Sequence, residues 1–384
     1  MEKQKNILFL SSWYPSKNHS TLGNFVQYHA EAIATLNNVY VLYLAPDDNF
    51  KKAVHIDNSL RNRVDTTIVY FKRNKLKYLN YFKALKKGLN YLTNVRDIHF
   101  DCIHMNVMLP SGWQAIYIKR KLNIPYIISE HWHGYQNLSK FKINLLQKII
   151  LKNVIKNASF ICPVTTQLKK AIESSGYEGN YKIIPNVVNV DKFKQISSPN
   201  KTKFTFLHVS TLVDEIKNIS GILKAFNKLE QKENILLRII GDGETDWIGE
   251  KAKSLNIPEE SILIEKEKTH DEIATAMQES DVFVLFSNIE NLPLVLIEAM
   301  ASGLPIITSN VGGILEHINS STGIVIEPKD INALTESMNK MILTHSQYNS
   351  DLIREYAVNY FSFPVISNQF NNLYNRALEK PKMN

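Results

Sequence analysis

The chain has 384 residues, of which 44% are hydrophobic and 21% charged, and this composition is typical of a globular protein and excludes a disordered one. Its length suffices for two ordinary domains with a core in each. The formal net charge is +8, yet residues 1–200 hold 28 Lys/Arg and 12 Asp/Glu (+16), whereas residues 201–384 hold 17 and 25 (−8). The basic half indicates an anionic surface or substrate, unless its lysines are simply spread over solvated faces.

The sequence shows no sign of export or of a membrane span. No apolar run approaches the roughly 20 residues of a transmembrane helix. The polar Met1–Lys5 leads directly into an apolar strand, and no signal-peptide pattern follows. Cys102 and Cys162 are isolated thiols outside any metal-ligand spacing, which suits a reducing compartment. We therefore expect a cytoplasmic protein.

Short apolar runs alternate with amphipathic helical stretches along the whole chain. Helices are expected at Phe25–Leu36 and Trp113–Leu122, and a last one over Pro364–Leu378. Strands alternating with helices predict βαβ units and parallel sheets. The expected strands of the first half are Ile7–Leu10, Val39–Leu44, Thr67–Phe71, Cys102–His104, Tyr126–Ser129 and Phe160–Pro163; those of the second half are Phe204–Val209, Ile235–Ile240, Ile262–Ile264, Val282–Phe286, Pro305–Thr308 and Ile324–Ile326.

Two successive sets of strands predict an α/β protein with two Rossmann-like domains. The first domain is expected over residues 1–185 and the second over 201–360. Residues 186–200, which include Ser197, Ser198 and Pro199, read as the linker, and a helix at about 361–384 is expected to pack back on the first domain. Ligands of such domains bind beyond the carboxyl ends of the strands.

The segment from Ser287 to Pro305 carries the strongest chemical signal. It follows an apolar strand, and Pro293 and Gly303 predict the start and end of a helix. Free N–H groups around Leu294 and Val295 would then form an anion site, because helix N-termini favour phosphate. Glu298, about two turns beyond Glu290, can accept hydrogen bonds from a vicinal diol, and Glu290 from sugar hydroxyls. Periodicity alone favours an ordinary amphipathic helix with Glu298 exposed.

The order of these motifs resembles the order in glycosyltransferase family four, whose members are retaining enzymes with the GT-B fold. Glu290-x7-Glu298, within S-x-x-E-x-x-P-L-V-x-x-E-A-M-A-x-G-x-P, is similar to the donor-site signature of that family. Further similar motifs are Gly23-Asn24, the strand ending at Glu130-His131, Pro185-Asn186, Gly241-Asp242-Gly243 and Val311-Gly312-Gly313. The resemblance spans nearly the whole chain, and it implies two Rossmann-like domains that face a central cleft.

The resemblance also implies roles for individual residues. Lys217 neutralises the leaving diphosphate, where negative charge develops as the glycosidic bond breaks. His131 and Glu290 position the sugar, with His133 as a rival for the first of these roles and His104 as a structural residue. The remaining donor-side residues that the family pattern implies are Glu298, Leu292, Leu294, Val295, Asn291, Thr211, Gly241 and Gly23. Gly23 is almost as well explained as a plain turn glycine.

The chain departs from the family pattern at three places. Ser210-Thr211 stands where the family has Gly-Arg. Thr211 has no guanidinium that could bind the diphosphate with two hydrogen bonds, so Lys217 has to supply more of the positive charge that stabilises the leaving group. Asn291 replaces a glycine, a mild change because Asn tolerates unusual backbone angles. Lys266 stands where a glycine is expected in the loop that commonly meets the base, which leaves the base open.

Two basic stretches of the first half contain interleaved apolar residues. They are Lys72–Lys87 and Lys140–Lys156. Such stretches can lie on anionic lipid, each charge contributing about 1 kcal/mol. In the alternative, the apolar residues face the core and the lysines are merely solvated. Nucleic acid is not expected as a partner, because no recognised binding module is present.

The resemblance implies a glycosyltransferase of hexosyl type that uses a UDP- or GDP-sugar as co-substrate. It also implies that the enzyme needs no cofactor and no metal, and the sequence contains no Asp-x-Asp motif that would suggest one. The acceptor is expected to be a lipid-linked or growing cell-surface glycan, as in polysaccharide and cell-envelope biosynthesis, with the enzyme peripheral on the inner face of the cell membrane. Two alternatives stay open. One is a nucleotide-sugar 2-epimerase of the same shape. The other is a non-catalytic sugar-nucleotide-binding or scaffold protein, which the departure at Thr211 permits.

Overall fold

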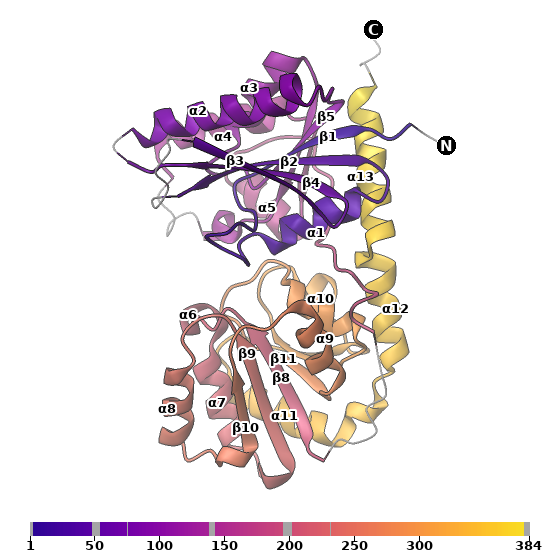
Figure 1. The fold of residues 1–384 in the computed structure, drawn as a ribbon. Coiled ribbons are helices and arrows are strands. Elements are labelled where there is room, and N and C mark those ends of the chain that lie inside the picture. Colours follow the sequence, from indigo (N-terminus) through magenta and orange to yellow (C-terminus); the bar gives the residue numbers. More distant parts are fainter. Residues whose placement is uncertain are drawn as a thin grey trace. The chain divides into compact units, whose positions relative to one another are not determined.

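The computed structural model describes residues 3–47, 54–74, 76–137, 143–194, 202–230 and 232–379. The chain folds into two compact units: unit 1 comprises Met1–Val187 and Phe363–Asn384, and unit 2 comprises Val188–Ser362 (Figure 1). The chain thus passes into unit 2 inside the stretch 186–200 predicted as linker, of which residues 195–200 lie outside the described residues. It returns to unit 1 for its last helix.

Unit 1 is built on a seven-stranded sheet. Its strand order is β3-β4-β2-β1-β5-β6-β7, and among these strands β3 alone pairs antiparallel. The order reverses between β1 and β5, so their following loops lie at the topological switch point. The strands are β1 (Asn6–Ser11), β2 (Asn38–Pro46), β3 (Val54–Arg61), β4 (Val64–Phe71), β5 (Cys102–Asn106), β6 (Tyr126–Glu130) and β7 (Phe160–Pro163).

All six strands predicted in the first half are confirmed, and β3 is the one that the sequence did not indicate. The predicted strands are largely apolar because a parallel sheet covered on both faces buries nearly all of its side chains. Strand β3 contains Asp57, Asn58 and Ser59 in a partly exposed edge position, and these residues give no apolar run.

Helices cover both faces of this sheet (Figure 1). One face carries α2 (Lys77–Asn90), α3 (Trp113–Leu122) and α4 (Leu145–Asn157), with the π-helical turn η1 (Tyr91–Val95) after α2. The other carries α1 (Asn24–Ile33), α5 (Thr166–Ser174) and α13 (Phe363–Leu378), with the short 3-10 helix η2 (His133–Asn137) packed on α5. The three helices whose bounds were predicted, α1, α3 and α13, are confirmed within three residues.

The C-terminal helix α13 belongs to unit 1, where it packs against α1, β5 and β6. Phe370 and Tyr374 are fully buried. The Thr35 hydroxyl donates to Ser367 Oγ over 3.1 Å, and the Lys5 ammonium donates to Asn371 Oδ1 over 3.1 Å. An element more than 175 residues distant in sequence thus completes the core of unit 1.

Unit 2 is built on a six-stranded sheet of parallel strands in the order β10-β9-β8-β11-β12-β13. Its switch point lies between β8 and β11. All six predicted strands are confirmed: they are β8 (Phe204–Ser210), β9 (Ile235–Gly241), β10 (Ile262–Glu265), β11 (Val282–Leu285), β12 (Ile306–Ser309) and β13 (Gly323–Ile326). Phe206, Phe226, Val284 and Met338 belong to one buried cluster on this sheet.

The helices of unit 2 follow its strands in βαβ order. They are α6 (Asp214–Lys217), α7 (Ile219–Asn227), α8 (Asp246–Ser254), α9 (His270–Gln278), α10 (Leu294–Ala301), α11 (Ile331–Thr344) and α12 (Ser350–Phe361), with 3-10 turns η3 (Lys232–Asn234), η4 (Glu259–Ser261), η5 (Ile314–Glu316) and η6 (His345–Gln347). No helix in the described part of the chain is long and apolar enough to span a membrane.

Candidate active site

The loops after β8 and β11 meet at the switch point of unit 2. Helix α6 follows β8 and ends at Lys217, and Glu290 lies in the loop between β11 and α10. The Lys217 ammonium donates to Glu290 Oε1 over 2.6 Å, and the Ser287 hydroxyl donates to the same oxygen over 2.8 Å. The two charged side chains are only 13% and 9% exposed. Two residues predicted from separate motifs therefore form one buried ion pair where parallel α/β sheets bind ligands.

Backbone contacts hold this loop in place. The Asn288 N–H donates to the Ile216 carbonyl over 2.7 Å, and the Asn288 amide donates to the Glu215 carbonyl over 3.0 Å. On the other side, Gly312 has a φ of 61°, and a Cβ there would lie 2.3 Å from the Glu290 carbonyl oxygen. Only glycine fits this close approach, which is the physical reason for the first glycine of Val311-Gly312-Gly313.

Helix α10 begins directly after this loop with an uncapped N-terminus. Pro293 occupies the N-cap position, and no side chain caps the helix. Leu292 is buried, while Leu294 and Val295 are partly exposed. The helix ends as predicted: Gly303, with a φ of 76°, follows it, and the Leu304 N–H donates to the Ala299 carbonyl over 3.0 Å. Helix α10 thus begins four residues after Glu290 of the ion pair, and a helix N-terminus suits a phosphate.

Glu298, in the second turn of α10, is only 2% exposed. Among the described residues its carboxylate has no hydrogen-bond or ion-pair partner, and burial raises the pKa of this carboxyl to about 8. The sequence periodicity favoured an exposed Glu298, and the structure shows that interpretation to be wrong. A buried carboxyl without a partner costs free energy, which a functional role would explain.

The end of α10 is fixed by Arg354 of α12. Its guanidinium donates to the Ala301 carbonyl at the end of α10, to the Phe193 carbonyl, and to the Val190 carbonyl over 3.0 Å. A cation at a helix C-terminus satisfies carbonyls that have no partner within the helix. Arg354 therefore ties the first residues of unit 2 to the helix that carries Glu298.

Thr211 and Gly241 lie together at the ends of β8 and β9. Gly241 packs so closely that a Cβ there would lie 1.9 Å from the Ser210 carbonyl oxygen. Ser210 itself has structural contacts, because its Oγ lies 2.8 Å from His208 Nε2 and accepts from the Leu212 N–H over 3.2 Å. Thr211 is exposed. Serine at the position of the family's glycine is thus part of the loop's own hydrogen bonding.

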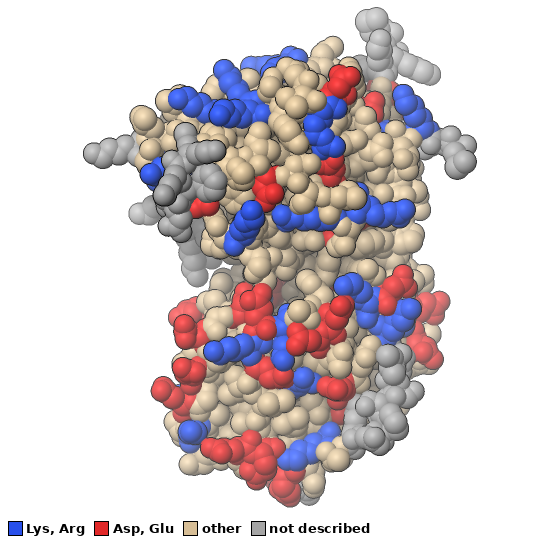
Figure 2. Space-filling view, viewed as in Figure 1, with Lys and Arg blue, Asp and Glu red and all other residues tan. Residues whose placement is uncertain are grey.

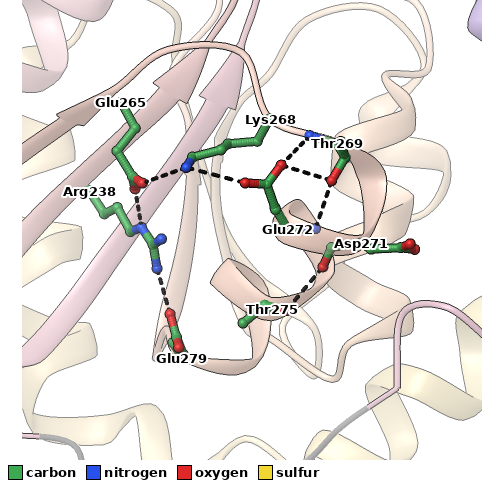
Figure 3. A network of polar contacts seen from close by, with 8 residues as sticks. All are labelled: Arg238, Glu265, Lys268, Thr269, Asp271, Glu272, Thr275 and Glu279. Carbon is green, nitrogen blue, oxygen red and sulfur yellow. Dashed lines mark hydrogen bonds and ion pairs between the residues drawn. The ribbon is translucent and has the colours of Figure 1, made fainter.

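Ion pairs fix the loop after β10, in which Lys266 replaces the expected glycine (Figure 3). Arg238 donates to Glu265 Oε2 over 2.6 Å, and Lys268 lies 3.4 Å from both Glu265 and Glu272. Thr269 and Glu272 form a capping box at the start of α9. These contacts hold both ends of the loop and leave Lys266 exposed between them.

In unit 1, His131 follows β6 and is buried. Its Nδ1 lies 3.0 Å from Asn186 Oδ1, and its ring is tilted against those of Phe25 and His29, with centroids 4.6 and 5.1 Å away. Burial, with a smaller contribution from His29, holds the pKa of His131 well below its usual value. A lowered pKa favours the neutral imidazole, which suits a hydrogen-bonding role.

Glu130 is the residue of this region that the sequence analysis did not select. It is fully buried, and its carboxylate accepts backbone N–H bonds from His131 and Trp132, each over 2.9 Å, and from Met108 over 3.0 Å. Burial raises its pKa to about 7, although the three N–H donors act in the opposite direction. Glu130 therefore positions the backbone of His131. A glutamate directly before the candidate histidine was the only available signal.

The other candidates of unit 1 have structural explanations. Gly23 caps α1 with a φ of 78°, and a Cβ there would lie 2.6 Å from the Trp13 carbonyl oxygen. Its close approach is thus to the loop after β1. His104 is fully buried, with Tyr374 Oη 2.7 Å from its Nδ1 and Ser129 Oγ 2.8 Å from its Nε2. The structure describes no group of three or more His, Cys, Asp and Glu residues within its described ranges that could hold a metal ion, and metal independence stays a prediction.

The chain is similar in sequence and in fold to known proteins. The model for glycosyl transferases group 1 matches residues 189–357, and that for glycosyltransferase family 4 matches residues 22–192. Protein CapJ of Staphylococcus aureus is 29% identical over 72% of this chain and 70% of its own length. The putative teichuronic acid biosynthesis glycosyltransferase TuaC of Bacillus subtilis is 23% identical over 87% of this chain and 88% of its own.

Anabaena Alr3699/HepE, solved in complex with UDP, has a similar structure. It superposes with a TM-score of 0.75 at 18% identity, over 97% of this chain and 100% of the other. The architecture of two Rossmann-like units is thus that of the GT-B glycosyltransferases, which confirms the predicted fold class. The two family models overlap at residues 189–192 and together cover residues 22–357, so the chain belongs to glycosyltransferase family four, and it is an enzyme of that kind.

Proposed function

We propose that this enzyme transfers a hexosyl group, with retention at the anomeric carbon, from a nucleotide-diphosphate sugar to a lipid-linked or cell-surface glycan. The observation that carries the proposal is the Lys217–Glu290 ion pair at the switch point of unit 2, beside the uncapped start of α10. An ammonium and the N–H groups of a helix N-terminus can bind a diphosphate, and a carboxylate can bind the hydroxyls of a sugar.

Lys217 and the start of α10 would bind the diphosphate. Without a ligand, Glu290 neutralises the Lys217 ammonium. A donor diphosphate brings its own negative charge, so the ammonium exchanges Glu290 for phosphate oxygens, and the Glu290 carboxylate becomes available to sugar hydroxyls. The transition state for glycosyl transfer is oxocarbenium-like, and charge builds up on the leaving diphosphate. Fixed positive charge placed there lowers the barrier.

Glu298 would bind the ribose of the nucleotide. A vicinal diol offers two O–H donors that a carboxylate accepts, so binding of the ribose should lower the raised pKa of Glu298 and release its proton. This contact would supply the partners that the buried Glu298 carboxylate lacks among the described residues. Replacement by alanine should therefore raise the donor KM more than it lowers kcat. The predicted contact between His131 and the donor stays a prediction, and His131→Ala tests it through the rate of transfer.

The glycan acceptor is proposed from two observations. The relative TuaC is named for teichuronic acid biosynthesis. In addition, the helices on one face of unit 1 are rich in cations, as expected of an enzyme that works at an anionic surface. Both fit a growing envelope polymer better than a small soluble sugar.

The proposal that the donor is a nucleotide-diphosphate sugar is tested by screening a panel of nucleotide sugars for slow hydrolysis by the purified enzyme. One nucleotide sugar should release its diphosphate, and Lys217→Ala should abolish this release, whereas Lys224→Ala, an exposed lysine on α7, should not. The released sugar should initially keep the donor's anomeric configuration in NMR spectra, and a chelator should leave the rate unchanged. Inversion, or an epimer formed from donor alone, would contradict the proposal.

A further inference from the structure

The helices on one face of unit 1 contain no acidic residue. These are α2, α3 and α4, which lie together on the same side of the sheet (Figure 1). They hold four lysines in α2 and three cations in each of α3 and α4, namely Lys77, Lys83, Lys86, Lys87, Lys119, Arg120, Lys121, Lys148, Lys152 and Lys156. We call this surface the basic face. Figure 2 shows Lys and Arg gathered along α2 and α3.

The cations of the basic face have no acidic partners. Within the described ranges none of them forms an ion pair, and all except the half-buried Lys119 are exposed. Helix α5, on the opposite side of the same sheet, shows the ordinary pattern, because its Lys169 pairs with Glu173 over 3.7 Å. Lysines merely spread over a solvated surface would include such pairs. Among the described residues, the charge of the basic face is therefore not compensated by ion pairs.

Helix α4 adds exposed aliphatic side chains to this charge. Leu145, Leu146 and Ile149 are 74%, 66% and 51% exposed, whereas Leu151 and Val154 on its other side are buried. The alternative that all apolar residues of this stretch face the core is thus wrong for Leu145, Leu146 and Ile149. Tyr78 at the start of α2 is likewise 81% exposed. Of the basic stretches predicted from sequence, Lys75, Lys140 and Lys142 lie outside the described residues.

Two adjoining grooves cross the basic face. The first, of about 590 Å³, lies between α3 and α4, and its lining includes Trp113, Arg120 and Ile150. The second, of about 640 Å³, lies between α2 and α3, and its lining includes Lys86 and Lys87. Tyr117 and Lys121 line both. Each groove therefore combines cations with aromatic or aliphatic walls, a combination that suits a phosphate attached to an apolar or amphipathic group.

We propose that the basic face docks unit 1 on an anionic lipid bilayer, with its cations against the headgroup phosphates and Leu145, Leu146 and Ile149 in the interface. Cationic charge with exposed aliphatic side chains on one surface is the pattern of interfacial binding. The positive charge would also suit nucleic acid, but three exposed aliphatic side chains would not contribute to the binding of nucleic acid. This inference deepens the acceptor half of the proposed function, because it brings the enzyme to the surface where a lipid-linked acceptor lies.

Vesicle flotation at low salt tests the inference. The full-length enzyme should bind vesicles containing phosphatidylglycerol and should not bind vesicles of phosphatidylcholine alone. Since each cation near an anionic surface contributes about fivefold in affinity, Lys86→Ala/Lys87→Ala/Lys121→Ala should bind about a hundredfold less tightly. The matched control is Lys224→Ala/Lys253→Ala/Lys340→Ala, three exposed lysines of unit 2, which should bind as the wild type does.

A second pair of variants separates lipid from other polyanions. Leu145→Ser/Leu146→Ser should weaken vesicle binding severalfold and leave heparin binding unchanged, whereas Leu343→Ser/Leu352→Ser, equally exposed leucines of unit 2, should change neither. Absence of vesicle binding by the wild type, or binding to heparin alone, would overturn the inference. Donor hydrolysis measured without lipid distinguishes the failures: hydrolysis without vesicle binding overturns only the docking, and vesicle binding without hydrolysis of any donor overturns the proposed function.

Discussion

The buried carboxyl of Glu298 should make the stability of the enzyme depend on pH in a specific way. Its pKa in the folded protein is about 8, against 4.5 for an unperturbed carboxyl. At a pH between these values the unfolded chain releases this proton and the folded protein keeps it, so the free energy of unfolding falls as pH rises. One pKa unit corresponds to 1.36 kcal/mol, so the loss between pH 4.5 and pH 8 is about 4 kcal/mol.

Glu298→Gln removes this titration while it keeps the shape of the side chain. The variant should match the wild type near pH 4.5 and exceed it increasingly up to pH 8, where the difference should reach about 4 kcal/mol. Urea unfolding at each pH, followed by circular dichroism, gives the two curves. Glu336→Gln, an exposed carboxylate on α11, is the control for the loss of one carboxylate. A constant difference between wild type and Glu298→Gln from pH 5 to pH 8 would refute the reasoning.

Other substitutions test the loops around the site. Gly312→Ala should lower the free energy of unfolding by about 1–3 kcal/mol and slow donor hydrolysis, because its φ of 61° is strained for alanine and the new Cβ meets the Glu290 carbonyl. As a control, Gly249→Ala, within helix α8 and with open space around it, should raise the free energy of unfolding by roughly 0.5–1 kcal/mol. Glu130→Gln should lower the free energy of unfolding by about 1–3 kcal/mol, because the amide nitrogen faces a backbone N–H, and equal urea midpoints would contradict this. Glu298→Ala should raise the donor KM at nearly constant kcat, and unchanged donor binding would remove the ribose assignment.

The sheets were predictable from the sequence because of how parallel strands are buried. Both faces of such a strand pack on helices, so β1 and β11 read as continuous apolar runs. Helix α10 was equally clear, because Pro293 and Gly303 mark its two ends. Strand β3 was not predictable, because an edge strand tolerates polar residues and gives no such run.

The geometry of the site required the structure. Lys217 and Glu290 are 73 residues apart, and their contact depends on β8 and β11 being neighbours in the sheet, which local patterns do not determine. The role of Glu130 could not be predicted from the sequence, because its hydrogen-bond partners are backbone N–H groups, which carry no sequence signal. Whether Leu145 and Leu146 face the core or solvent was equally open, since helix α4 is apolar on both sides.

The central claim is that Lys217 and the start of α10 bind the diphosphate of the donor. Calorimetric titration of UDP and GDP into the full-length enzyme and into Lys217→Ala tests it most directly. The account predicts that the wild type binds at least one of the two and that Lys217→Ala binds it at least about tenfold more weakly, since a hydrogen bond to a charged group contributes about 1.5–3 kcal/mol. Equal affinity of wild type and Lys217→Ala for the nucleotide that binds, with Lys224→Ala as reference, would contradict it.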